Sequence, residues 1–138
     1  FEPELFWSAR AVDVSKSKQF RKGLDQLDEE GVVQVLRDLD APTAAPVLGA
    51  VGQMQFEVFA HRLQFEFGAE VEMSPTSWAV ARRTDAETAD KVRQLRGTRV
   101  LGSLDGTLFA LFDSTGRLAR TIADNPDWLL ERVVETAG

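Results

Sequence analysis

Residues 47–73 read VLGAVGQMQFEVFAHRLQFEFGAEVEM, and the hydrophobic pattern changes twice within this stretch. The apolar run 47–51 has the length of a short buried strand, and 70–73 predicts a second one. Between them, 54–67 places apolar residues three or four positions apart, as on one face of a helix. The core-facing positions of this helix are Phe56, Phe59, Ala60, Leu63 and Phe67, and Gly68 is expected to end it. The stretch therefore predicts a strand, a helix and a strand.

The residues that precede this stretch complete a familiar order of elements. Alternation over 4–12 predicts a strand with both faces partly covered. Residues 15–31 predict a helix, and 32–37 predict a second strand. The apolar stripe of the helix is Phe20, Leu24 and Leu27. The resulting order β-α-β-β-α-β is the split βαβ arrangement of ferredoxin-like domains, with two helices on one face of an antiparallel sheet.

The rest of the chain repeats this order more faintly. The expected elements are a strand at 78–83, a helix from the capping box Thr84–Glu87 to Gly97, hairpin strands at 100–104 and 107–112 around Asp105–Gly106, and a helix at 115–124. Residues 128–134 fit either a strand or a helix. The sequence thus predicts an α+β protein of two consecutive ferredoxin-like sandwiches, 1–76 and 77–138, each with an antiparallel sheet and helices on one face.

Composition limits the chemistry of the chain. It has 138 residues, no cysteine, one histidine and a formal net charge of −6. Disulfides, thiolate metal sites and cysteine nucleophiles are excluded, and one histidine cannot build an ordinary zinc site. We find no catalytic motif, and the glycines before the helix 54–67 lack the Lys-Ser/Thr of a phosphate loop. We expect no catalytic, cofactor-binding or metal-binding residue, no contact with a membrane, and a soluble cytoplasmic protein. The start at Phe1, without methionine, suggests a fragment of a longer protein.

Charges on the helix 15–31 oppose its own dipole. Its basic start contains Lys16, Lys18, Arg21 and Lys22, and its acidic end contains Asp25, Asp28, Glu29 and Glu30. Each such placement is unfavourable by roughly 0.3–1 kcal/mol, whereas a basic helix start suits an anion such as phosphate. The expected helix 84–97 has the conventional order, acidic first. Two interpretations remain: a solvated face with pairs Arg21–Asp25 and Lys22–Gln26, or a contact with a polyanion or another partner.

The helix 54–67 carries a second apolar stripe opposite its core face. This stripe comprises Met54, Val58 and Phe65, beside His61 and Arg62. An isolated half-domain would expose these side chains, so we expect the stripe to dock against the second sandwich or against a missing part of a parent protein. A small-molecule groove is a weaker interpretation.

Several strings of the first half are familiar in combination. FEPELF at 1–6, KSKQFRKGLDQL at 16–27, EEGVVQV at 29–35, GAVGQMQFEV at 49–58 and FGAEV at 67–71 resemble the C-terminal domain of bacterial peptide-chain release factor 3. The resemblance is close over 1–82, and beyond Asp85 it extends only to length and element order.

The resemblance implies a non-catalytic domain of a translational GTPase that recycles class I release factors from the ribosome. GTP and Mg would bind in an N-terminal domain that is absent here and is followed by a β-barrel domain. The implied partners are those two domains, the small-subunit protein and RNA of the ribosome and, indirectly, class I release factors. The basic start would then contact the ribosome, and the second stripe would dock.

Two alternatives to this assignment remain. The equivalent domain of an elongation-type GTPase is disfavoured by the string 16–35. A ligand-binding regulatory domain of tandem ferredoxin-like type would need a polar pocket between its sheets.

Overall fold

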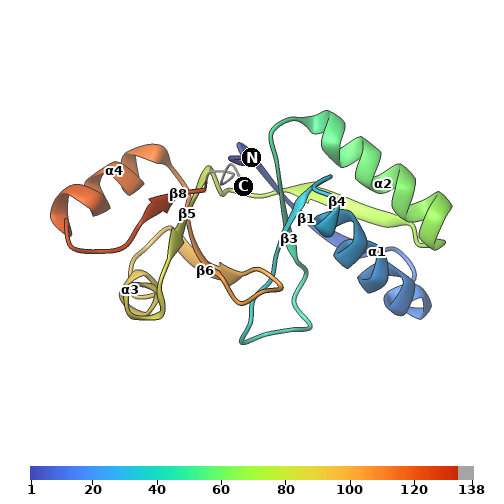
Figure 1. Cartoon of the computed structure of the whole chain (residues 1–138), viewed down its shortest axis with the longest axis horizontal. Coiled ribbons are helices and arrows are strands. Elements are labelled where there is room, and N and C mark those ends of the chain that lie inside the picture. The colour runs from blue at the N-terminus through green and yellow to red at the C-terminus, as the bar shows by residue number, and fades with distance from the viewer. Residues whose placement is uncertain (134–138) are drawn as a thin grey trace.

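Residues 1–133 are described by a computed structural model, which contains two four-stranded sheets (Figure 1). The first half is built from β1 (Leu5–Ala11), η1 (Val14–Lys16), α1 (Ser17–Glu29), β2 (Gln34–Leu36), β3 (Val47–Ala50), α2 (Gln53–Phe67) and β4 (Val71–Pro75). The second half is built from β5 (Val80–Thr84), α3 (Ala86–Val92), β6 (Thr98–Gly102), β7 (Leu108–Phe112), α4 (Thr115–Asp124) and β8 (Glu131–Arg132).

Both sheets have the same strand order. The first runs β2-β3-β1-β4 and the second runs β6-β7-β5-β8, with every neighbouring pair antiparallel. In each half the first strand therefore lies between the third and the fourth, as the split βαβ order requires. The predicted α+β class with two tandem ferredoxin-like sandwiches is confirmed.

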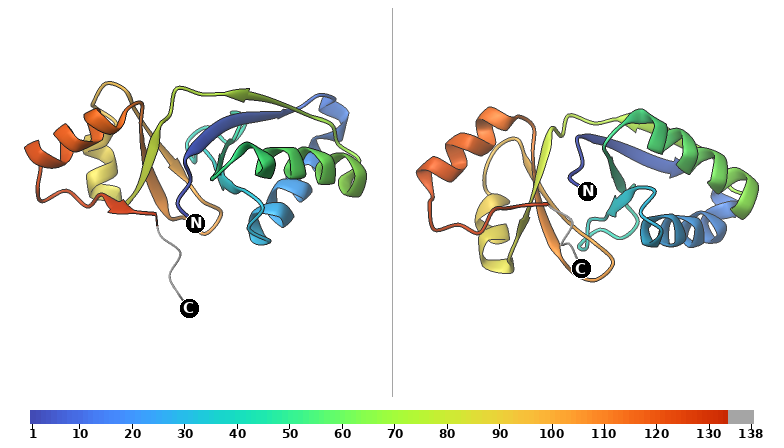
Figure 2. Two further views of the ribbon diagram at one scale, coloured as in Figure 1. Left: turned by 90° about the horizontal axis from the view of Figure 1, so that it is seen from above. Right: turned by 45° about the horizontal axis from the view of Figure 1, so that its top comes forward.

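The helices of each half cover one face of their sheet. In the first half, α1 and α2 lie on the same side (Figure 2), and their stripes meet β1, β2 and β3 in one core. Leu27, Phe59 and Leu63 in this core are completely buried. In the second half, α3 and α4 close a smaller core around Phe112 and Val92. The helical stripes predicted for 15–31 and 54–67 are confirmed.

The uncovered faces of the two sheets pack against each other. Phe6, Leu36 and Val47 of the first sheet meet Ala81, Leu101, Phe109 and Leu111 of the second in a continuous apolar cluster. Sheets therefore lie in the middle of the molecule and helices at its two ends (Figure 1). This arrangement explains why both faces of β1 are apolar.

Backbone and charged contacts join the same two halves. Arg37 and Gly102 exchange backbone hydrogen bonds of 2.8 and 2.6 Å. Near the N-terminus, the Glu2 carboxylate accepts hydrogen bonds from Arg132 at 2.6 Å and from Arg82 at 3.4 Å. The hydrogen bond from Arg132 lowers the pKa of Glu2. The halves are thus connected by side chains, by backbone and by the linking segment.

Several predicted boundaries were wrong, for local reasons. The expected helix 15–31 starts as the 3₁₀ turn η1, because the Asp13 carboxylate accepts the Ser15 N–H at 2.9 Å. The helix predicted from Thr84, α3, begins after Asp85, whose carboxylate accepts the Thr88 N–H, and Thr84 itself belongs to β5. That helix ends at Val92, before the predicted Gly97.

The structure also defines two further segments, a loop whose length differs from the predicted hairpin and a region whose type the sequence left open. The Asp105–Gly106 connection is a five-residue loop, 103–107, in which the Asp105 carboxylate accepts the Thr107 N–H at 3.0 Å. Within 128–134, residues 131–132 form the short strand β8, and position 134 lies outside the described residues.

Candidate functional site

The predicted basic start lies on the surface at the outer end of the first half. Lys16 is the last residue of η1 and precedes α1, which carries Lys18, Arg21 and Lys22. All four side chains are exposed, and none of them forms an ion pair within residues 1–133. Their positive charge is therefore available to an external anion.

The acidic end of α1, by contrast, has partners within the protein. Asp25 pairs with Arg37 at 2.5 Å, and Glu30 pairs with Arg62 of α2 at 2.8 Å. The hydrogen bonds from Arg62 lower the pKa of Glu30 and raise that of Arg62. These carboxylates hold α1 against β2 and α2, which offsets their unfavourable position at the C-terminal end of the helix dipole.

Asp28 at this end has a different environment. Its carboxylate accepts the backbone N–H of Val35 at 3.3 Å, at the start of β2. Burial raises the pKa of Asp28, although the hydrogen bond from Val35 acts in the opposite direction. The Asp28 carboxyl group is therefore partly desolvated where it connects the end of α1 to β2.

The pairs expected of a merely solvated helix face are not formed. Asp25 turns to Arg37, so it does not pair with Arg21. Gln26 donates to Glu30 at 2.8 Å, and no hydrogen bond joins Lys22 to Gln26 among residues 1–133. The two expected pairs are therefore absent from residues 1–133, and for Asp25 the reason is that Arg37, outside α1, binds its carboxylate.

A groove beside the basic start has a volume of about 530 Å³. Arg10, Arg21 and Arg37 supply its charged lining, and α1, β1 and the loop 42–46 supply its apolar walls. Arg10 is also within 3.6 Å of Glu72. Because Arg10 and Arg37 are both paired with carboxylates, Arg21 is the one arginine of this lining without an ion pair among residues 1–133.

The second stripe of α2 lies open on the surface. Met54 and Phe65 are each 70% exposed and Val58 is 40% exposed. The expectation that the second sandwich covers this stripe was wrong, because the halves meet through their sheets. The His61 ring lies 4.6 Å from the Phe65 ring, and Arg62 is held by Glu30 and Glu66.

Two kinds of feature are absent from the described residues. Residues 1–133 contain no group of three or more His, Cys, Asp or Glu side chains arranged to hold a metal ion. None of the described helices is both long and apolar enough to cross a membrane.

Comparisons with known proteins point to one family. Residues 1–122 match the family model described as class II release factor RF3, C-terminal domain. Over 135 residues the chain is 38% identical to peptide chain release factor 3 of Nostoc punctiforme, covering 96% of this chain and 25% of that protein. The protein of the same name from Synechococcus elongatus is 37% identical over 139 residues, with coverages of 99% and 25%. That from Symbiobacterium thermophilum is 39% identical over 128 residues, with coverages of 91% and 24%. The chain thus spans about a quarter of the length of these curated relatives.

Proposed function

This chain belongs to the family of class II release factor RF3 C-terminal domains, and we propose that it is the ribosome-contacting domain of a translation-termination GTPase. In this proposal the domain performs no chemistry. GTP and Mg bind elsewhere in the whole protein, which acts in the cytoplasm and promotes the release of class I factors from the ribosome. The units 1–76 and 77–138 work as two parts of one domain.

The observation that carries this proposal is the unpaired basic start on an acidic domain. With a net charge of −6, the chain as a whole repels polyanions, so contact with RNA has to be local. Lys16, Lys18, Arg21 and Lys22 form such a local surface, and phosphate contacts from Lys and Arg supply most of the affinity of non-specific RNA binding. The ribosomal partner is therefore an RNA or protein surface of the small subunit with negative charge.

We further propose that the stripe Met54, Val58 and Phe65 docks on the GTPase or β-barrel domain of the same protein. Glu4 donates a backbone hydrogen bond of 2.9 Å to Ala50, which brings the first residues of the chain beside the start of α2. A preceding domain would join the chain where the two halves meet, because Arg82 and Arg132 bind Glu2 there, and the stripe begins at Met54, four residues after Ala50. His61 and Arg62 flank the stripe and complete this candidate docking surface.

Charge reversal tests the ribosome contact. In the full-length protein, Lys18→Glu, Arg21→Glu and Lys22→Glu together are expected to reduce ribosome affinity by roughly tenfold or more at physiological salt, with a shallower salt dependence. Stability should stay the same or rise, because the substitutions agree with the helix dipole. Ribosome pelleting and the rate of class I factor release are the measurements. Unchanged values in both would exclude the basic start as the contact.

Substitution of the stripe tests docking. Met54→Asp with Phe65→Asp should leave the isolated chain folded, with a change in unfolding free energy of about 0.5 kcal/mol or less, because both side chains are exposed. In the full-length protein the same pair should lower the melting temperature by uncoupling the domains. A large loss in the isolated chain, measured by urea denaturation, would instead assign the stripe to an internal core.

The two alternatives have less support. A ligand-binding regulatory domain would need a polar pocket between its sheets, but that space is filled by Phe6, Leu101 and Phe109. The family match and the three relatives likewise favour a release factor over an elongation-type GTPase.

A further inference from the structure

We propose that the groove between α3 and α4, at the opposite end of the molecule from the basic start, is a second binding site for the phosphate backbone of RNA. This inference rests on the proposed function, because it gives the ribosome-contacting domain a second point of attachment. Its key residues are Arg96 and Arg120, and Arg117, which is paired with Asp113, lines the same groove.

The distribution of ion pairs first identifies this site. Of the sixteen lysines and arginines, ten have a carboxylate within 4.0 Å among residues 1–133. Four of the remaining six form the basic start of α1. The other two are Arg96 and Arg120, which both line a single groove. In a chain with twenty-two acidic residues, two unpaired arginines in one groove mark a second local positive surface.

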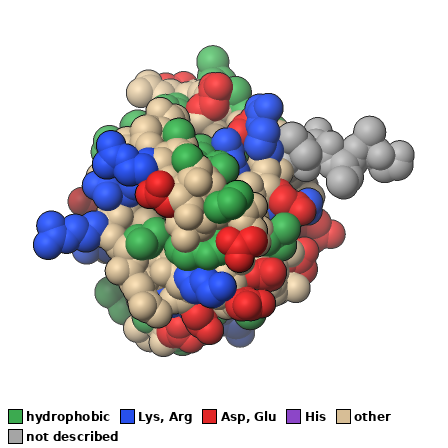
Figure 3. Space-filling model, turned by 90° about the vertical axis from the view of Figure 1, so that its left-hand side faces the viewer, with side chains coloured by type: hydrophobic (Ala, Val, Ile, Leu, Met, Phe, Trp, Pro, Cys, Tyr) green, Lys and Arg blue, Asp and Glu red, His purple; other side chains and the backbone are tan. Residues whose placement is uncertain are grey.

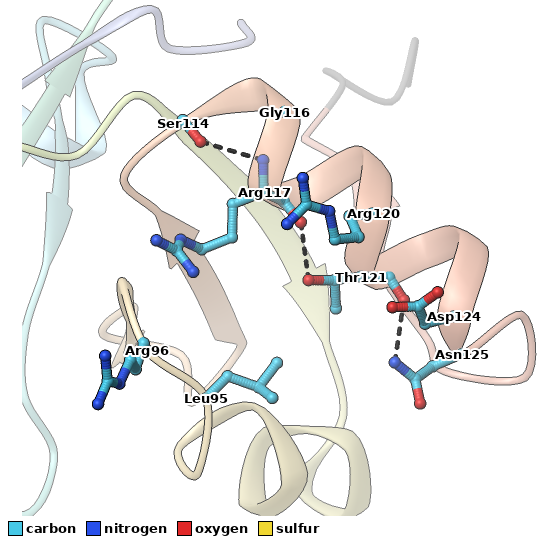
Figure 4. Close-up of a pocket in the computed structure, with 9 residues that line it drawn as sticks. All are labelled: Leu95, Arg96, Ser114, Gly116, Arg117, Arg120, Thr121, Asp124 and Asn125. Carbon is cyan, nitrogen blue, oxygen red and sulfur yellow. Dashed lines mark hydrogen bonds between the residues drawn. The ribbon is translucent and has the colours of Figure 1, made fainter.

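Residues from two separate segments line this groove (Figure 4). It has a volume of about 430 Å³ and lies between the loop after α3 and the exposed side of α4. Arg96 comes from that loop, and Arg117 and Arg120 come from α4. The floor includes Leu95. The one carboxylate in the lining, Asp124, lies at the far end of α4 from Arg96.

Gly97 lies against the ion pair that Arg117 of this groove forms with Asp113. It has a φ of +67°, and its backbone oxygen accepts the Asp113 N–H at 3.0 Å. A Cβ at Gly97 would overlap Asp113 and the Nε of Arg117. Because glycine has no side chain, this space is free for the Asp113 carboxylate, which accepts the Arg117 Nε–H at 2.7 Å. Arg117 is thereby held beside Arg96 and Arg120, and the pair is itself partly exposed.

Guanidinium groups on a groove favour RNA phosphate over an acidic protein surface. Each guanidinium presents a planar set of N–H donors that pairs with the oxygens of phosphate or of carboxylate. A nucleic-acid backbone, however, presents its phosphates at regular intervals, which suits several arginines on one groove. At this end of the molecule Lys and Arg side chains lie at the left, the upper right and the lower centre of Figure 3, and most Asp and Glu side chains lie toward its lower right. Because α1 and α4 occupy opposite ends (Figure 1), one domain can hold two separate stretches of backbone.

A charge-matched pair of double variants tests the site in the 138-residue chain. Arg96→Gln with Arg120→Gln removes two unpaired charges from the groove. Arg83→Gln with Lys91→Gln removes two charges from the same half, but from side chains that are already paired with Glu131 and Glu87. Binding to a fluorescent RNA duplex of about 20 base pairs is measured as a function of salt concentration. The same variants are then tested in ribosome pelleting.

We expect the groove variant to bind the duplex about tenfold more weakly than the control, with the slope of log K against log salt reduced by about 2. Equal affinity of the two variants, or no binding of the unaltered chain at low salt, would overturn the proposal. Weaker ribosome binding with unchanged duplex affinity would also overturn it and would indicate an acidic protein partner. If the groove variant keeps the duplex and ribosome affinity of the control while the Lys18, Arg21 and Lys22 variant loses ribosome affinity, the proposed function stands and only this inference fails.

Discussion

Replacing Phe6 with alanine is expected to lower the free energy of unfolding by about 3–5 kcal/mol, the largest effect of any single substitution considered for this chain. Phe6 is 2% exposed and lies between the two sheets, against residues of the second half such as Phe109 and Leu111. Removing its ring leaves a cavity. The strands on either side of it are held in their sheets by backbone hydrogen bonds, so they cannot move in to fill it. Val12→Ala, at the end of the same segment and 56% exposed, should change stability by about 0.5 kcal/mol or less.

The same substitution should destabilise both halves at once. Two proteins that each retain a single tryptophan, Trp7 in the first half or Trp128 in the second, report the two halves separately during urea denaturation. Coincident transitions, shifted equally by Phe6→Ala, are expected because the cavity lies in the shared apolar cluster. A shift seen by Trp7 alone would show that the halves unfold independently.

Gly23→Leu is expected to be the second most damaging change, with a loss of about 2–3 kcal/mol. Gly23 is buried in α1 where this helix meets α2. A Cβ at this position would overlap Leu63 and lie 3.2 Å from the Phe67 ring. Leu63 is completely buried and has little room to move. The helices would therefore have to separate, which would disturb the Glu30–Arg62 ion pair between them.

Gly116→Leu is the matched control for this prediction. Gly116 also lies in a helix, α4, but nothing lies within 4 Å of a Cβ built there. Because leucine favours a helix over glycine, the control should gain up to about 1 kcal/mol. Thermal or urea unfolding of both variants gives the comparison. Similar changes in the two proteins would contradict the close packing of α1 against α2.

Hydrophobic periodicity was sufficient to predict the fold. The stripes Phe20, Leu24, Leu27 and Phe56, Phe59, Leu63 were identified correctly, because only one face of each helix meets the sheet. The apolar residues on both sides of β1 also indicated that the sheet face away from the helices is covered. Which surface covers that face could not be predicted, since the contact joins β1, β2 and β3 to strands of the second half that lie far away in the sequence.

The candidate sites were only partly accessible from the sequence. Reversal of charge along one helix was visible, so the basic start could be singled out. Arg96 and Arg120 stand on different elements, and their lack of partners becomes apparent only when every carboxylate is placed in space. The partner of Asp25 was mispredicted for the same reason. The residue that binds it is Arg37, which directly follows β2, and not Arg21 on the neighbouring turn of the same helix.

The packing of the two sheets against each other determines what a truncated gene product would do. A premature stop between β4 and β5 would yield a first half in which Phe6, Leu36 and Val47 form a bare apolar sheet. Such a product would aggregate or be degraded instead of persisting with half the activity. Nonsense mutations and gene fusions at this midpoint should therefore behave as complete losses of the domain.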